Sequence, residues 1–87
     1  MPQILIRHKV TDFDKWKFVF YEHGAKRKAS GSKGRRIFRN DDDPNELIVI
    51  FDWDNQENAK RFIKSRDLHD SMRQAGVSDE PDMYYLD

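Results

Sequence analysis

The chain has 87 residues, the size of one small domain, and we expect residues 1–87 to form a single unit. Its 16 basic and 16 acidic side chains cancel, so net charge gives no reason to expect nucleic acid or an anionic membrane as partner. The absence of cysteine excludes disulfides and thiolate chemistry. No apolar run approaches the roughly 18 residues of a membrane span, and the N-terminus lacks signal-peptide features. We therefore expect a cytoplasmic protein with no membrane partner.

The first predicted element is a strand over residues 3–10 (QILIRHKV). Its alternation places Ile4, Ile6, His8 and Val10 on one face. His8 is thus a polar residue on an otherwise apolar face. It would either line a pocket or hydrogen-bond a partner in the core.

Residues 11–27 (TDFDKWKFVFYEHGAKR) predict one amphipathic helix, with Thr11 as N-cap and Asp14 in the capping-box position. Spacings of three and four define one stripe on this helix. The stripe comprises Phe13, Trp16, Phe20, His23 and Arg27. Phe18 and Tyr21 point away from it, which predicts an exposed aromatic pair and a second contact surface.

The middle of the chain predicts a loop over residues 29–34, an edge strand over 35–40 and a polar turn over 41–45. Residues 46–53 (ELIVIFDW) form the strongest predicted strand. Leu47, Val49, Phe51 and Trp53 share one of its faces, and Ile48 and Ile50 share the other. Because both faces are apolar, this strand should be central and covered on both sides.

A second helix should begin after Asp54, with Glu57 in the box position, and should break near residues 65–67. Gly76 fits the residue just beyond its C-terminus. The last strand is predicted over residues 83–86 (MYYL), where Tyr84 and Tyr85 lie on opposite faces.

This order of elements predicts an α+β, ferredoxin-like βαββαβ fold. Its four-stranded antiparallel sheet would carry the helices on one face, with the first and third strands central. The apolar outer face of strand 46–53 would then be wet in a monomer. Packing a second copy against this face removes the exposure, so we expect a homodimer.

Several motifs together resemble one family. They are VTDFDKWKFVFYEH, GSKG, DDDPNE, ELIVIFDWDN, SRDLHDSMRQAGV and the final YYL. They resemble the dimeric α+β barrel superfamily, in particular its antibiotic-biosynthesis-monooxygenase-like and cyclase-like single-domain proteins. The resemblance implies a pocket between the helices and the sheet of each subunit, at which Trp16, His23, Arg27 and Trp53 occupy generic positions. It also implies a small apolar or aromatic ligand.

The activity implied by this resemblance is cofactor-free monooxygenation or cyclisation of an aromatic or polyketide-like metabolite. The alternative is a non-catalytic ligand-binding or stress-related homodimer. The superfamily also includes haem-degrading enzymes, but their Asn, Trp and His set has no match of similar spacing here. We therefore expect no cofactor.

His23 and Arg27 are the sharpest candidates for chemistry, because residues four apart on a helix meet on one face. His23 could act as a base on an acidic phenol or enol, and Arg27 could hold the resulting enolate or a carboxylate. The alternative is that His23 bonds a carbonyl at the helix end while Arg27 reaches solvent. Ligand-binding candidates are Trp16, Phe20, Arg27, His8, Trp53 and Tyr85.

Two other kinds of site are not expected. The three histidines lack short ligand spacing, which argues against a metal site. The basic run over residues 26–39 could bind phosphate or RNA. However, its aromatic spacing does not fit an RNA-recognition strand, and an acidic turn follows it. We therefore expect no nucleic-acid partner.

Overall fold

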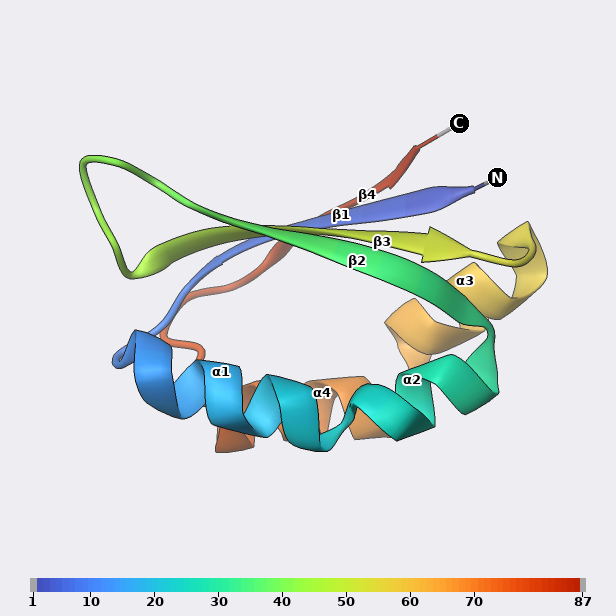
Figure 1. The fold of residues 1–87 in the computed structure, drawn as a ribbon, viewed down its shortest axis with the longest axis horizontal. Coiled ribbons are helices and arrows are strands. Elements are labelled where there is room, and N and C mark those ends of the chain that lie inside the picture. Colours follow the sequence, from blue (N-terminus) through green and yellow to red (C-terminus); the bar gives the residue numbers. More distant parts are fainter. Residues whose placement is uncertain (1, 87) are drawn as a thin grey trace.

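A computed structural model describes residues 2–86, which form a four-stranded antiparallel sheet with four helices on one of its faces (Figure 1). The elements are β1 (Gln3–Lys9), α1 (Phe13–Glu22), α2 (Gly24–Ser30), β2 (Ser32–Arg39), β3 (Glu46–Trp53), α3 (Gln56–Lys64), α4 (Arg66–Gln74) and β4 (Asp82–Leu86). The strand order is β2-β3-β1-β4, so the first and third strands are central. The predicted ferredoxin-like fold is confirmed.

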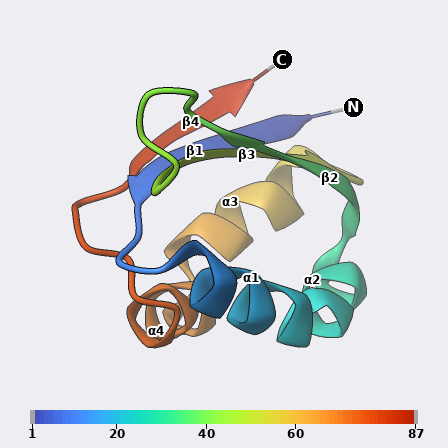
Figure 2. The same cartoon turned by 60° about the vertical axis from the view of Figure 1, so that its left-hand side comes forward.

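The core lies between the sheet and the helices, which share one side of it (Figure 2). In the β1–β3 pair, Ile4 lies opposite Phe51, Ile6 opposite Val49, and His8 opposite Leu47. These side chains all lie on the helix-covered face and are all buried, as the two-residue period of a strand requires.

The predicted single helix over residues 11–27 is wrong in one respect. Helix α1 ends at Glu22, α2 begins at Gly24, and His23 forms the junction with non-helical φ and ψ of −92° and 5°. Glycine is a weak helix former, which accounts for the interruption at Gly24. The N-cap is also displaced by one residue, because the carboxylate of Asp12, not the hydroxyl of Thr11, accepts from the first-turn amides.

The predicted loop over residues 29–34 is shorter in the structure. Helix α2 continues to Ser30, and β2 already begins at Ser32, with an irregularity in its pairing before Gly34. The chain reverses at Gly31, whose φ of 120° is a conformation that only glycine adopts readily. A Cβ there would lie 2.5 Å from an oxygen of Asp54.

The second helical segment breaks where the sequence predicted. Ser65 ends α3 and begins α4, and its hydroxyl accepts a hydrogen bond from the backbone N–H of Leu68. The cap of α3 is Asn55 in place of the expected Asp54. Gly76, with φ of 83°, follows α4 as predicted. No helix within residues 2–86 is long and apolar enough to cross a membrane.

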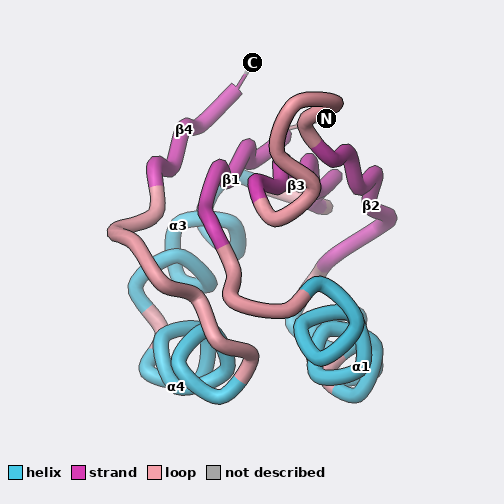
Figure 3. The backbone as a smooth tube through the Cα atoms, turned by 90° about the vertical axis from the view of Figure 1, so that its left-hand side faces the viewer, coloured by secondary structure: helices cyan, strands magenta, loops and turns pink. Residues whose placement is uncertain are grey.

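The opposite face of the sheet has no helix over it (Figure 3). Phe38, Ile48 and Tyr84 on this face are 49%, 37% and 56% exposed. Arg7 lies beside them and makes ion pairs with Glu46, Asp79 and Asp82. Within one chain, β3 is therefore covered on one side, and its second apolar face remains open.

The aromatic pair on α1 is exposed as predicted. Phe18 is 69% exposed, and Tyr21 is also largely accessible. The guanidinium of Arg35 on β2 lies 5.0 Å from the Tyr21 ring, so the chain itself contacts Tyr21. Phe18 has no aromatic or cationic partner of this kind within residues 2–86.

Candidate functional site

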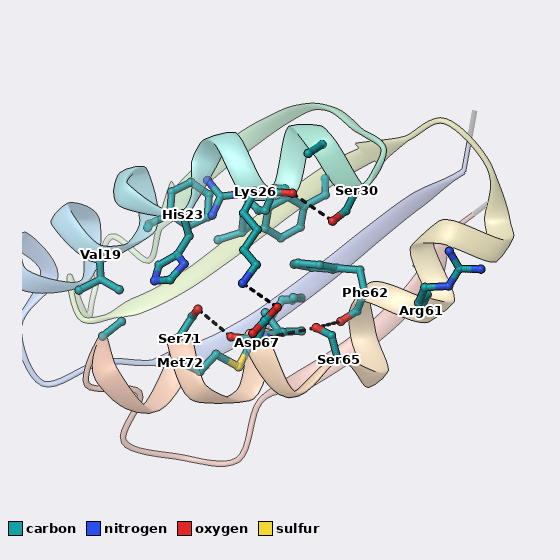
Figure 4. A pocket seen from close by; sticks show the side chains of 18 of the residues that line it. Val19, His23, Lys26, Ser30, Arg61, Phe62, Ser65, Asp67, Ser71 and Met72 are labelled. Carbon is teal, nitrogen blue, oxygen red and sulfur yellow. Dashed lines mark hydrogen bonds and ion pairs between the residues drawn. The ribbon is translucent and has the colours of Figure 1, made fainter.

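A cavity of about 440 Å³ lies between the helical layer and the sheet, with residues of α1 to α4, β1 and β3 on its walls. The sheet contributes Ile6, Val49 and Phe51, while Trp16 and Phe20 come from α1. Figure 4 shows Phe62 and Met72 on the α3–α4 side and His23 and Lys26 on the side of α1 and α2. This volume is of the size that proteins use for small organic ligands.

Aromatic rings form a continuous wall of the cavity. The centroids of Trp16 and Phe20 are 4.8 Å apart, those of Phe20 and Phe51 are 5.9 Å apart, and those of Phe51 and Phe62 are 5.6 Å apart. Such rings offer an apolar ligand extensive contact area and directional packing. The wall therefore suits a flat or aromatic molecule.

His8 lies in this wall with only 3% of its surface exposed. Its ring is 5.9 Å from that of Trp16, and neither ring nitrogen has a hydrogen-bond partner within residues 2–86. Burial lowers the pKa of His8 to about 4, so the imidazole is neutral at physiological pH. Both nitrogens have almost no accessible surface, so their unmet hydrogen-bonding capacity costs the fold roughly 1–3 kcal/mol.

Arg27 is the second buried polar group of the cavity, with 9% of its surface exposed. Its guanidinium carbon lies 3.8 Å from the centroid of Phe20 and 5.8 Å from that of Phe51. Burial, and to a smaller extent the charge of Arg35, lower the pKa of Arg27 to about 10. The guanidinium remains charged at neutral pH. Most of the Arg27 residue is packed inside the protein, but its nitrogens are not among the fully buried unpartnered polar atoms of residues 2–86.

His23 occupies the α1–α2 junction, where it is half-buried and lines the cavity. Its side chain makes no cap hydrogen bond to the helix, so the alternative role of bonding a carbonyl at the helix end is not found. In Figure 4 the imidazole points from the junction toward the side occupied by Ser71 and Asp67 of α4. His23 is therefore placed to meet a ligand near the outer part of the cavity.

An ion pair crosses the cavity between α2 and α4. Lys26 Nζ lies 2.8 Å from an Oδ of Asp67, and both side chains are largely exposed (Figure 4). The hydrogen bond and the charge of Lys26 lower the pKa of Asp67. The two residues are far apart in the sequence and each resembles an ordinary surface charge, so sequence reasoning missed the pair.

Two predicted ligand-binding residues do not line the cavity. Trp53 is fully buried in the core, with its ring centroid 4.8 Å from that of Phe62. Tyr85 is on the edge strand β4, where it is half-exposed and lies 5.9 Å from Lys60 Nζ. The structure brings together His8, Trp16, Phe20, His23 and Arg27 and leaves Trp53 and Tyr85 outside.

Comparisons with known proteins were made at the level of sequence and of structure. No protein-family model matches the chain, and neither does any curated protein. Solved structures match over nearly the whole chain. A candidate antibiotic biosynthesis monooxygenase from Bordetella bronchiseptica has a TM-score of 0.80 at 14% identity, covering 99% of this chain and 94% of that chain.

Two further structures give the same result. A candidate antibiotic biosynthesis monooxygenase from Caulobacter crescentus has a TM-score of 0.77 at 17% identity, covering 99% of this chain and 87% of that chain. SnoaB, a cofactor-independent oxygenase from Streptomyces nogalater, has a TM-score of 0.73 at 16% identity, covering 95% of this chain and 89% of that chain. The chain thus has the α+β fold of the antibiotic-biosynthesis-monooxygenase-like proteins, and the family resemblance inferred from the sequence is confirmed at the level of fold.

Proposed function

We propose that the chain forms a small-molecule-binding, dimeric α+β barrel domain that oxygenates an aromatic or polyketide-like metabolite without a cofactor. The observation that carries the proposal is the aromatic-walled cavity, whose lining includes the buried polar residues His8 and Arg27. A cavity of this kind excludes water while offering a few directed polar groups. The likeness to SnoaB in fold supports the same class of chemistry.

The polar residues of the cavity differ in burial, and we assign their proposed roles accordingly. His23, at the more accessible junction, is the proposed base that removes the proton of a phenol or enol. Arg27 is the proposed anion-binding group of the cavity, for the enolate or for a carboxylate of the ligand. His8, neutral because of its burial, forms part of the cavity wall beside Trp16. Trp16 and Phe20 pack against the aromatic ring of the ligand.

The proposed reaction is balanced without any cofactor. The deprotonated, electron-rich ring transfers an electron to O₂, the two radicals combine, and a C–O bond forms to a peroxide. Loss of one water breaks the O–O bond and leaves a carbonyl. In sum, one phenol and one O₂ give one quinone and one water. The apolar aromatic wall limits contact between the carbanion-like intermediate and solvent.

The test is oxygen uptake with 1,5-dihydroxynaphthalene, followed by an oxygen electrode and by quinone absorbance. His23→Ala should lower turnover by about 10²-fold or more, the usual contribution of a positioned base. His69→Ala provides the control, because His69 is exposed on α4 and lies outside the cavity. Equal turnover in both variants and wild type would remove His23 from the mechanism.

The same experiment separates the second candidate function, a non-catalytic ligand-binding or stress-related homodimer. Its specific support is the cavity itself, because an aromatic-walled cavity can bind a ligand whether or not any reaction follows. A binding protein would be stabilised by the phenol, with a rise in Tm, but would consume no oxygen. That outcome would reject the oxygenase and retain the ligand site.

A further inference from the structure

Arg27 carries a largely buried charge that has no counterion within residues 2–86. Its guanidinium rests on the face of Phe20, and it makes no hydrogen bond or ion pair with any residue of the described range 2–86. Aromatic faces attract a cation but do not accept the in-plane N–H hydrogen bonds of a guanidinium. A charge that is largely withdrawn from water and has no counterion gains free energy when an anion binds beside it.

The other charges of the cavity do not supply that partner. Among the described residues that line the cavity, Asp67 is the single carboxylate. It already forms an ion pair with Lys26. Arg61 is held by Glu57, one helical turn away on α3. His8 is neutral. The lining therefore has one uncompensated positive charge, at Arg27.

A second hollow, of about 530 Å³, meets the first at Arg27. It lies between α2 and β2 and is bordered by three further cations, Lys28, Lys33 and Arg35. None of these three makes an ion pair within residues 2–86. Arg35 is near enough to Arg27 to lower its pKa. Arg27 thus lies in a positive field, which further favours an anion beside it.

We propose that the ligand is an aromatic carboxylic acid, with its ring in the apolar cavity and its carboxylate bound by Arg27. This inference rests on the proposed function in requiring that the cavity takes an aromatic molecule. A planar guanidinium matches the two oxygens of a carboxylate, and one such anion compensates its charge. The positive charge of Arg35 further stabilises the bound carboxylate.

The experiment compares two probes of similar shape, 2-naphthoate and 2-naphthamide, by isothermal titration calorimetry at pH 7.5. The wild-type chain should bind the acid at least about 10-fold more tightly than the amide, since hydrogen bonds between charged groups are about twice as strong as neutral ones. Arg27→Gln should abolish this preference and leave the affinity for the amide within about 2-fold.

A second pair of variants keeps the test informative if Arg27→Gln does not fold. Arg35→Gln alters an exposed residue of the basic hollow and should weaken binding of the acid several-fold while leaving binding of the amide unchanged. Arg36→Gln is the matched control, because neighbouring strand residues project from opposite faces. It should change neither affinity.

The outcomes separate this inference from the proposed function. Equal binding of the acid and the amide by the wild type would overturn the proposal that the ligand is a carboxylic acid. Equal losses of affinity for both probes in Arg35→Gln would do the same. Either result would still be compatible with an aromatic ligand in the cavity. Failure of both probes to bind would overturn this inference and the proposed function together.

Discussion

At the scale of single residues, His8 couples the cavity to the stability of the fold. The imidazole is 3% exposed, and burial lowers its pKa from 6.5 to about 4. The charge of Asp79 opposes this shift, and that of Arg7 reinforces it. Between these two pKa values the unfolded chain binds a proton that the folded chain does not bind.

The free energy of unfolding should therefore fall as the pH is lowered from about 6.5 toward 4. Because the stability present above the unfolded pKa is lost on acidification, we expect a decrease of about 2 kcal/mol between pH 7 and pH 5. Urea unfolding at several pH values in this range measures the slope. His8→Phe should remove most of it, whereas His69→Gln, at an exposed position, should preserve it. An unchanged slope in His8→Phe would contradict the assignment.

Of the seven site residues predicted from helical and strand spacing, five line the cavity. The helix stripe gave Trp16, Phe20, His23 and Arg27, and it survives the break at His23 because Arg27 remains packed on Phe20. Strand alternation placed Trp53 on the same face as Phe51 and left open which of Tyr84 and Tyr85 faces inward. It says nothing of where along a strand a cavity lies. Trp53 and Tyr85 each fall beside it, one in the core and one at the edge.

At the scale of elements, the α2–β2 connection depends on Gly31. Its φ is 120°, and its backbone carbonyl accepts a hydrogen bond of 2.9 Å from the N–H of Asp54. The sequence indicated a turn from its glycines but placed it too broadly, because local propensity alone does not show that α2 continues to Ser30.

Gly31→Ala should destabilise the fold by about 1–3 kcal/mol, since alanine resists a positive φ and its Cβ would meet the Asp54 carboxylate. Gly24→Ala is the matched control: a Cβ there has its nearest neighbour 3.6 Å away, at an Arg27 nitrogen. It should be nearly neutral. Urea midpoints of the two variants measure the difference. Equal effects would show that the conformation at Gly31 imposes no special requirement.

The Lys26–Asp67 pair should affect ligand exchange more than stability. Asp67→Asn removes a contact between exposed groups across the cavity, so the unfolding midpoint should hardly move. Release of 2-naphthoate should become several-fold faster, because α2 and α4 are no longer tied together beside the ligand. Stopped-flow fluorescence measures this rate. Asp70→Asn, at an exposed position outside the cavity lining, is the control and should release the ligand at the wild-type rate.

At the scale of the whole molecule, the sequence predicted the fold because its periodicities agreed with one topology. Strand 46–53 is apolar on both faces, and the structure places it centrally between β2 and β1. One of these faces carries the core. The other carries Ile48 and Ile50, beside Phe38, Leu5 and Tyr84 on the neighbouring strands, with no helix above them. A folded single chain thus leaves a second apolar surface that its own elements do not cover.

The proposed homodimer buries this open sheet face against the same face of a second copy. Ile48→Glu would place a charge among the apolar side chains of that interface and should weaken association by about 100-fold or more. Phe18→Glu is the comparison, because Phe18 is a similarly exposed apolar residue on α1, on the helix side. It should leave the dimer intact. Sedimentation equilibrium at micromolar concentration measures both. A folded 10.4 kDa monomer in the wild type would reject the dimer, and dissociation caused by Phe18→Glu alone would move the interface to α1.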